Sequence, residues 1–298
     1  MEYRQLGKSD LNVSVIGLGC MSLGYDHTAN AQIIHRAIDL GISYFDTADI
    51  YQTGFNEETL GKALKGVRQQ VMIASKVGNV PRADGSGLDW NPRKSHILES
   101  VRSTLRRLNT DYLDVYQLHG GTIDDPIDET ISAFEQLQKE GLIRWYGISS
   151  IRPNVIREYV SRSHIVSNMM QYSLLDRRPE EESLDLLHEH DISVVVRGAV
   201  AKGLLAGKAA TAYLGISEKE VRQVQGLLRE LVVPGRSVAQ AAIRFALSHP
   251  AVATLALGAS NLTQLEENAA AAKSPALTSD EIDFLRAGAP MEIYELHR

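Results

Sequence analysis

Four side chains with acid–base chemistry stand at the ends of three apolar segments. Asp46 and Tyr51 occur in "YFDTADIY", Lys76 in "IASKVG" and His119 in "VYQLHG". A turn ordinarily needs only small polar residues, so a carboxylate and a phenol at these positions require another explanation. If the three segments are neighbouring strands about 4.8 Å apart, the four side chains can meet within a few ångströms.

Together these groups suit general-acid catalysis. A phenol has a pKa of about 10, and an adjacent ammonium is expected to lower it. Lys76 stays charged in a partly dry pocket only if a carboxylate pairs with it, and Asp46 can do so. His119 can donate to a substrate carbonyl oxygen. Such a site can protonate an oxygen that gains negative charge, a task worth roughly 10²–10⁴-fold in rate.

The four groups supply no electrons, so a reduction at this site requires a hydride-donating cofactor. Each residue also has a plainer interpretation, because buried Asp–Lys pairs and histidines at strand ends are more often structural than catalytic. Their corresponding positions on three successive segments favour a shared catalytic role.

Eight apolar, β-branched segments alternate with helical stretches along the chain. The predicted strands are 13–19, 43–48, 71–77, 113–119, 143–149, 165–173, 193–199 and 253–259. The helical stretches include 29–41, 91–108, 126–141, 179–190 and 237–250. Alternation of this kind indicates parallel pairing. Eight such units in 298 residues predict an α/β fold, a closed (β/α)8 TIM barrel with its chemistry at the carboxyl ends of the strands.

Three segments add to the eight units. Residues 2–14 predict an N-terminal β-hairpin that closes the barrel floor. Extra helices are predicted at 217–231, after the seventh strand, and at 278–288, near the C-terminus. No linker or repeat interrupts the chain, so we expect a single domain over 1–298. Prolines are expected at the first positions of three helices, namely Pro92, Pro126 and Pro179.

The competing fold is an open, doubly wound dinucleotide-binding sheet, because "GLGCMSLG" follows the first strand. The fingerprint of that fold requires a third glycine three positions beyond the second. Ser22 occupies that position, so the barrel is preferred.

Composition and charge exclude several function classes. The 31 basic and 37 acidic residues give a net charge of −6, which provides no basic surface for nucleic acid or anionic lipid. The single cysteine, Cys20, excludes a disulfide framework and a Cys-rich metal site. No apolar run approaches the ~18 residues of a membrane-spanning helix, and the first ten residues are too charged for a secretory signal. We therefore expect a cytoplasmic protein with a small-molecule partner, while its oligomeric state stays undefined.

Two glycine-containing loops near the last two strands indicate a phosphate site. Residues 197–208 contain three glycines with Lys202 and Lys208, and residues 258–268 lead into a helix that Ser260 or Asn261 can cap. Free N–H groups and the helix dipole favour an anion there. The plainer interpretation is a flexible loop before a capped helix. Beside the four acid–base residues, a dinucleotide reaching the catalytic mouth is preferred.

The same motifs resemble those of the aldo-keto reductases. "GISYFDTADIYQTGFNEETLGKAL" looks like the first signature of that family, and Asp46, Tyr51, Lys76 and His119 match its catalytic tetrad one by one. The similarity continues through "LQKEGLIRWYGISS", "MQYSLLDRR", "AKGLLAGK", "VAQAAIRFALSHP" and "GASNLTQLEEN". The resemblance implies a barrel that binds NADP(H) and reduces aldehyde or ketone carbonyls by direct hydride transfer, with Tyr51 as general acid and no metal.

The resemblance also implies the ligand contacts. Ser149, Ser150 and Gln171 would contact the nicotinamide carboxamide, residues 198–208 the pyrophosphate, and residues 260–268 the adenosine end. The full predicted cofactor set is Gly19, Cys20, Met21, Asp46, Ser149, Ser150, Gln171, Arg197, Gly198, Val200, Lys202, Gly203, Leu205, Lys208, Gly258, Ser260, Gln264, Glu267 and Asn268. Cys20 and Met21 are included for their position after the first strand, where packing is an equal alternative for such side chains. Trp90, in the long loop after the third strand, is expected to contact substrate with Tyr51 and His119.

Three positions depart from the pattern of many relatives. Arg197 replaces an aromatic ring that stacks on nicotinamide; a guanidinium can also stack, but its charge would repel the oxidised ring. Ser149-Ser150 replaces a Ser-Asn pair. No basic residue occurs in 258–268 to bind a 2′-phosphate, so NADH is kept as the alternative to NADP(H).

Two other functions compete with carbonyl reduction. A lysine at a strand end can form a Schiff base, as in an aldolase, but pairing with Asp46 would keep Lys76 protonated. A non-catalytic, cofactor-sensing barrel subunit is the second alternative, and the intact group of four residues argues against it.

Overall fold

Eight parallel strands form the centre of the molecule. In the computed structural model, which describes residues 1–298, they close into a barrel in the order β3-β4-β5-β8-β9-β10-β11-β12. Their bounds are Ile16–Gly19, Tyr44–Asp46, Met72–Val77, Leu113–Leu118, Ile143–Ser149, Ser167–Gln171, Ser193–Arg197 and Val252–Gly258. The prediction of a closed (β/α)8 barrel is confirmed.

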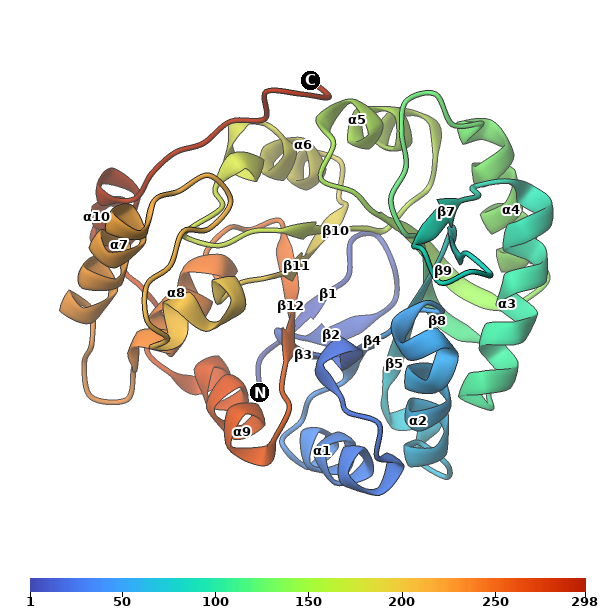
Figure 1. The fold of residues 1–298 in the computed structure, drawn as a ribbon, viewed down its shortest axis with the longest axis horizontal. Helices are drawn as coiled ribbons and strands as arrows, with labels where there is room; N and C mark the ends of the chain where they lie inside the picture. Colours follow the sequence, from blue (N-terminus) through green and yellow to red (C-terminus); the bar gives the residue numbers. More distant parts are fainter.

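Helices surround this barrel, as Figure 1 shows. One helix follows each strand: α1 (His27–Asp39), α2 (Phe55–Ala63), α3 (Lys94–Leu108), α4 (Ile127–Lys139), α5 (Pro153–Arg162), α6 (Ser183–Glu189), α8 (Val238–Leu247) and α9 (Leu262–Ala270). The two predicted additions are present as α7 (Glu218–Glu230) and α10 (Ser279–Gly288). None of these helices is both long and apolar enough to cross a membrane.

The three helices that were predicted to begin at a proline begin at other residues. Helix α3 begins at Lys94, two residues after Pro92, and Pro126 is the N-cap of α4 rather than its first helical residue. Pro179 lies in a short 3-10 helix, Arg178–Glu181, ahead of α6. Proline lacks an N–H that the first turn would leave unpaired anyway, so several positions near a helix start accept it.

The barrel floor is closed by the predicted N-terminal hairpin. Strands β1 (Tyr3–Gln5) and β2 (Asn12–Ser14) pair antiparallel, at the centre of the ring in Figure 1. Leu6 and Leu11 of this hairpin are buried in a cluster with barrel-interior residues that include Tyr44, Val115 and Val195. The predicted strand 13–19 is thus two strands, one in the hairpin and one in the barrel.

A second hairpin, absent from the sequence-based prediction, follows the third barrel strand. Strands β6 (Asn79–Pro81) and β7 (Leu88–Trp90) pair antiparallel and return the chain to the mouth. Trp90 ends this hairpin and lies against Gly78, since a side-chain carbon added at Gly78 would meet the indole at 2.6 Å.

Candidate active site

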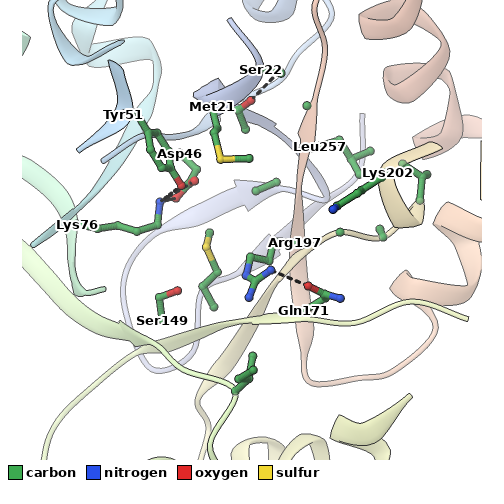
Figure 2. A pocket seen from close by; sticks show the side chains of 18 of the residues that line it. Met21, Ser22, Asp46, Tyr51, Lys76, Ser149, Gln171, Arg197, Lys202 and Leu257 are labelled. Carbon is green, nitrogen blue, oxygen red and sulfur yellow. Dashed lines mark hydrogen bonds and ion pairs between the residues drawn. The ribbon is translucent and has the colours of Figure 1, made fainter. Parts of the chain in front are cut away.

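The four acid–base residues converge at the carboxyl ends of β4, β5 and β8. Asp46 ends β4, Lys76 lies next to last in β5, and His119 follows β8. Lys76 Nζ lies 2.7 Å from the nearer carboxylate oxygen of Asp46, 2.7 Å from the Thr47 carbonyl oxygen and 3.4 Å from Tyr51 Oη. Figure 2 shows this side chain pointing toward both Asp46 and Tyr51. The structure therefore brings the acid, the ammonium and the phenol into one contact group.

The turn that carries Tyr51 is fixed from two sides. Gln52 and Thr53 have left-handed backbone, with φ of 51° and 55°, a conformation that side chains other than glycine adopt at a cost. The buried Asn56 accepts from Thr47 Oγ1 at 2.8 Å and donates to the Cys20 carbonyl oxygen at 2.8 Å. The phenol thus lies over the strand ends because one amide ties the loops after β3 and β4 together.

Burial and charge act in opposite directions on the three contacting groups. Burial by itself lowers the pKa of Lys76, but Asp46 and Tyr51 outweigh it and raise that pKa overall. Burial raises the pKa of Asp46, with Lys76 opposing. The proton of this pair therefore belongs to Lys76, which is fully buried.

The pKa of Tyr51 does not follow the sequence-based expectation. Burial raises it above its usual value of 10.0, although the neighbouring Lys76 lowers it in part. The expected net lowering is wrong, because the phenol loses more solvation than the ammonium restores. The ammonium still favours the phenolate and so assists proton release.

His119 is held neutral. Burial, followed by the charges of Lys76 and Arg197, lowers its pKa to about 3. Its Nδ1 is buried without a hydrogen-bond partner, so Nε2 is the ring nitrogen left for a ligand. The Tyr51 and His119 rings meet edge to face with centroids 6.1 Å apart, which places a phenol and a neutral imidazole side by side.

One cavity of about 1470 Å³ joins these residues to the two glycine-containing loops. The predicted ligand residues that line it are Gly19, Met21, Asp46, Tyr51, Lys76, Trp90, His119, Ser149, Ser150, Gln171, Arg197, Gly198, Val200, Lys202, Gly203, Lys208, Gly258, Ser260, Gln264, Glu267 and Asn268. Two of the residues predicted to contact the cofactor lie elsewhere. Cys20 and Leu205 are fully buried in the core between barrel and helices and do not line the cavity.

The loop after β11 turns sharply and is held by hydrogen bonds of its own. Ala201, Lys202 and Gly203 are all left-handed, with φ of 46°, 57° and 92°, and the amides of Ala201 and Gly203 donate to the carbonyl oxygens of Gly198 and Val200 within the turn. The Lys208 ammonium donates to the Lys202 carbonyl oxygen at 2.9 Å. From behind, the buried Gln225 of α7 donates to the carbonyl oxygens of Leu204 and Lys208 at 2.7 and 2.9 Å.

The loop after β12 is ordered by its own side chains. Asn261, not Ser260, caps α9 by accepting from the Gln264 amide. The Gln264 side chain accepts from both the N–H and the hydroxyl of Ser260 at 3.0 Å. This end of the cavity offers amides, a hydroxyl and the Glu267 carboxylate, with no basic residue from 258–268.

Comparison with known proteins agrees with this geometry. The profile described as the Aldo/keto reductase family matches residues 15–288. The chain belongs to the aldo-keto reductase family. It is 50% identical to the "Uncharacterized oxidoreductase YqkF" of Bacillus subtilis, with all of both chains covered. It is 32% identical to the "NADH-specific methylglyoxal reductase" of Escherichia coli, with 72% of each covered. The holo form of aldo-keto reductase AKR11C1 from Bacillus halodurans has a TM-score of 0.94 and 52% identity, covering 100% of this chain and 99% of that one.

In this aldo-keto reductase, Arg197 projects into the mouth from the end of β11. Its guanidinium donates to Gln171 Oε1 at 2.7 Å, and Gln171 Nε2 in turn donates to Tyr213 Oη at 3.1 Å. Figure 2 shows the Arg197–Gln171 contact in the open part of the cavity. The amide of Gln171 is therefore already used by two protein partners.

Several residues around the aldo-keto reductase site escaped sequence analysis. The buried Asn168 of β10 both accepts from and donates to the Ser150 backbone at 3.1 Å, which holds the turn after β9. A polar residue within the apolar run "IVSNMMQ" was the available signal. Arg152 and Tyr213 also line the cavity, but they lie in loops whose course no periodicity defines.

Proposed function

We propose that this aldo-keto reductase is an NADP(H)-dependent enzyme that reduces the carbonyl of an aldehyde or ketone to an alcohol, with Tyr51 as general acid. The observation that supports this is the contact of the Lys76 ammonium with Asp46 at 2.7 Å and with Tyr51 Oη at 3.4 Å, beside His119. The family supplies the reaction class, and the contact supplies a proton donor in the right surroundings.

The cavity fits an elongated, phosphate-bearing cofactor. Its volume exceeds the ~300–1,000 Å³ of most small-ligand sites, and Lys202 and Lys208, which line it at the loop after β11, suit the negative charge of a pyrophosphate. Ser149, Ser150 and Gln171 would face the nicotinamide end, and Ser260, Gln264, Glu267 and Asn268 the adenosine end. When bound, the cofactor supplies a hydride to the carbonyl carbon.

The protein's own groups act on the carbonyl oxygen. His119 Nε2, in its neutral form, donates a hydrogen bond that orients and polarises the carbonyl. Tyr51 Oη gives its proton to that oxygen as it becomes an alkoxide. Lys76 then stabilises the phenolate left on Tyr51, and Asp46 keeps Lys76 charged throughout. Each charge in this scheme, on the alkoxide, the phenolate or the ammonium, is thus stabilised by a neighbouring group of the protein.

Two alternatives are weaker. A Schiff-base aldolase needs a neutral, nucleophilic Lys76, whereas Asp46 raises the pKa of this lysine. A cofactor-sensing subunit needs no proton donor, so the contacts of Lys76 with Asp46 and Tyr51 would have no catalytic role in it.

Loss of reduced-nicotinamide absorbance with a reactive aldehyde tests the proposal. We expect turnover with NADPH, and a fall of at least roughly 10²-fold in kcat for Tyr51→Phe. Tyr112→Phe is the matched control, because the Tyr112 hydroxyl contacts only Gln69. Equal turnover by Tyr51→Phe and wild type would overturn the role of the phenol.

A fluorescence titration with NADPH and NADH tests the choice of nucleotide. NADPH is expected to bind more tightly, with Lys202 or Lys208 supplying the charge that 258–268 lacks. Tighter binding of NADH would assign this protein to NADH, in line with Glu267 at the adenosine end.

A further inference from the structure

The mouth cavity has an excess of positive side chains in a protein whose net charge is −6. The positively charged lining residues are Lys76, Arg152, Arg197, Lys202 and Lys208. The negatively charged ones are Asp46 and Glu267. Asp46 already neutralises Lys76. The proposed cofactor accounts for Lys202 and Lys208 at its phosphates and for Arg197 at its nicotinamide end. The two arginines, Arg152 and Arg197, hydrogen-bond only neutral groups, and Arg197 already lies at the proposed nicotinamide end, so Arg152 is the one left for another ligand.

Arg152 lies on the substrate side of the mouth. It is the third residue after β9, and its guanidinium donates to the carbonyl oxygen of Gly121, two residues after His119. Strands β8 and β9 are paired, with Leu118 opposite Ile148, so the loops that follow them are neighbours. The guanidinium therefore stands beside the loop that carries the carbonyl-orienting imidazole.

No carboxylate neutralises Arg152. Asp125, a carboxylate in the loop after β8, accepts instead from Trp90 Nε1 at 3.0 Å and from the Thr122 amide at 2.7 Å, and it does not line the cavity. The only hydrogen bond of the Arg152 side chain goes to a neutral carbonyl oxygen. A guanidinium has five N–H donors in a planar fork, so enough remain to bind both oxygens of a carboxylate.

We propose that Arg152 is a specificity residue that selects carbonyl substrates bearing a carboxylate on the far side of the molecule from the reacting carbonyl. This inference rests on the proposed reductase function and names the substrate class. The carboxylate would pair with Arg152 while the carbonyl oxygen lies at Tyr51 and His119. Trp90, which lines the same cavity and lies against Gly120, provides an apolar wall between the two ends.

A matched pair of aldehydes tests this selection. 4-Carboxybenzaldehyde and methyl 4-formylbenzoate present the same ring and aldehyde, and differ in whether the far end is charged. The measured quantity is the ratio of kcat/KM for the acid over that for the ester, with NADPH-loaded enzyme. We expect wild type to favour the acid, and Arg152→Gln to lower the ratio roughly 10- to 100-fold, as for loss of a charged hydrogen-bonded contact. Arg152→Lys should retain part of the preference.

Arg229→Gln is the control for loss of one positive charge, because Arg229 lies on the exposed face of α7, outside the cavity; its ratio should equal that of wild type. A ratio near one in wild type, or an equal fall in kcat/KM for both aldehydes in Arg152→Gln, would overturn the proposal and leave Arg152 a support for the Gly121 loop.

If neither aldehyde is reduced, the proposed function fails instead. Calorimetric titration of the cofactor-loaded protein with 4-carboxybenzaldehyde then decides the point, with weaker binding to Arg152→Gln expected and unchanged binding contradicting it.

Discussion

The Lys76 ammonium has no contact with solvent, so its charge depends on Asp46. Removing one member of a buried ion pair leaves the other unpaired and costs about 3–5 kcal/mol. We therefore expect Asp46→Asn and Lys76→Met each to lower the free energy of unfolding by about that amount. The double variant should be less destabilised than the sum of the two.

Urea unfolding of the four proteins in this cycle measures the coupling. If each single variant lowered the free energy of unfolding by less than about 1 kcal/mol, a value typical of exposed ion pairs, the result would mean that water reaches the Asp46–Lys76 pair.

His119 makes the stability of the fold sensitive to acid. Its pKa is about 3 in the folded protein, against 6.5 when unfolded. Between these values the unfolded chain binds a proton that the folded one does not, so stability falls as pH drops below about 6.5. From pH 7.5 to 5, wild type should lose about 2 kcal/mol more than His119→Asn. Chemical denaturation at the two pH values measures the difference, and parallel losses would contradict a neutral His119.

Residues at strand ends and in the two glycine-containing loops could be predicted from sequence, whereas Arg152 and Tyr213 could not. Asp46, Lys76 and His119 each interrupt an apolar run, and a parallel barrel brings such positions together. Arg152 has no comparable signal, because its distinguishing property is the lack of a carboxylate partner in space. The direction of the Tyr51 pKa shift could not be predicted, because the sequence indicates the neighbouring charge but not the extent of burial.

The inserted helix α7 supports the loop after β11, residues 197–208, which is the proposed phosphate loop. Gln225 is the contact that does so, through the carbonyl oxygens of Leu204 and Lys208. We expect Gln225→Met, which keeps the size but removes both donors, to weaken NADPH binding roughly tenfold while kcat changes little. A structural role alone would alter stability without this separation of Kd from kcat.

Fluorescence titration and initial rates measure the two quantities. Gln32→Met on α1 is a matched control, because Gln32 is exposed, and it should bind NADPH as wild type does. A Kd for Gln225→Met equal to that of the control would remove α7 from the cofactor site.

The insertion itself was predictable, but its task was not. Residues 217–231 show a helical period, and the helix begins with a capping box at Ser217. Which loop the helix supports depends on the side-chain contacts of one buried glutamine. The second hairpin, β6–β7, was missed because its strands are three residues long and largely exposed.

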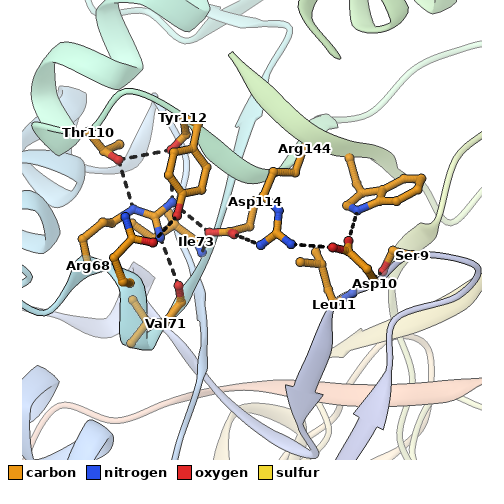
Figure 3. A network of polar contacts seen from close by, with 12 residues as sticks. Ser9, Asp10, Leu11, Arg68, Val71, Ile73, Thr110, Tyr112, Asp114 and Arg144 are labelled. Carbon is orange, nitrogen blue, oxygen red and sulfur yellow. Dashed lines mark hydrogen bonds and ion pairs between the residues drawn. The ribbon is translucent and has the colours of Figure 1, made fainter. Parts of the chain in front are cut away.

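For the molecule as a whole, a polar network at the hairpin end is separate from the catalytic mouth. Figure 3 shows Asp114 between Arg68 and Arg144, and Arg144 reaching Asp10 of the hairpin turn. Asp114 is buried, and it also accepts from the Ile73 amide at 2.9 Å. The network joins the hairpin to the first residues of β5, β8 and β9, at the end of the barrel where polar residues are expected to stabilise the fold rather than to act in catalysis.

Asp114→Asn should therefore lower stability by about 3 kcal/mol, because it leaves Arg68 without its carboxylate partner. Asp10→Asn is the matched control, with a side chain 66% exposed, and should cost less than about 1 kcal/mol. Thermal unfolding measures both, and KM for the aldehyde should be the same in the two variants. A larger loss of stability for Asp10→Asn than for Asp114→Asn would mean that the contact with the hairpin contributes most of the stabilisation by this network.

The support of the proposed phosphate loop by α7 has an engineering consequence. The proposed proton donor, Tyr51, is positioned by Asn56 of α2, which ties the loops after β3 and β4 together, while the proposed phosphate loop is supported by a helix inserted more than 150 residues later in the chain. Exchanging that helix between homologous barrels would retune coenzyme affinity and leave the acid chemistry in place.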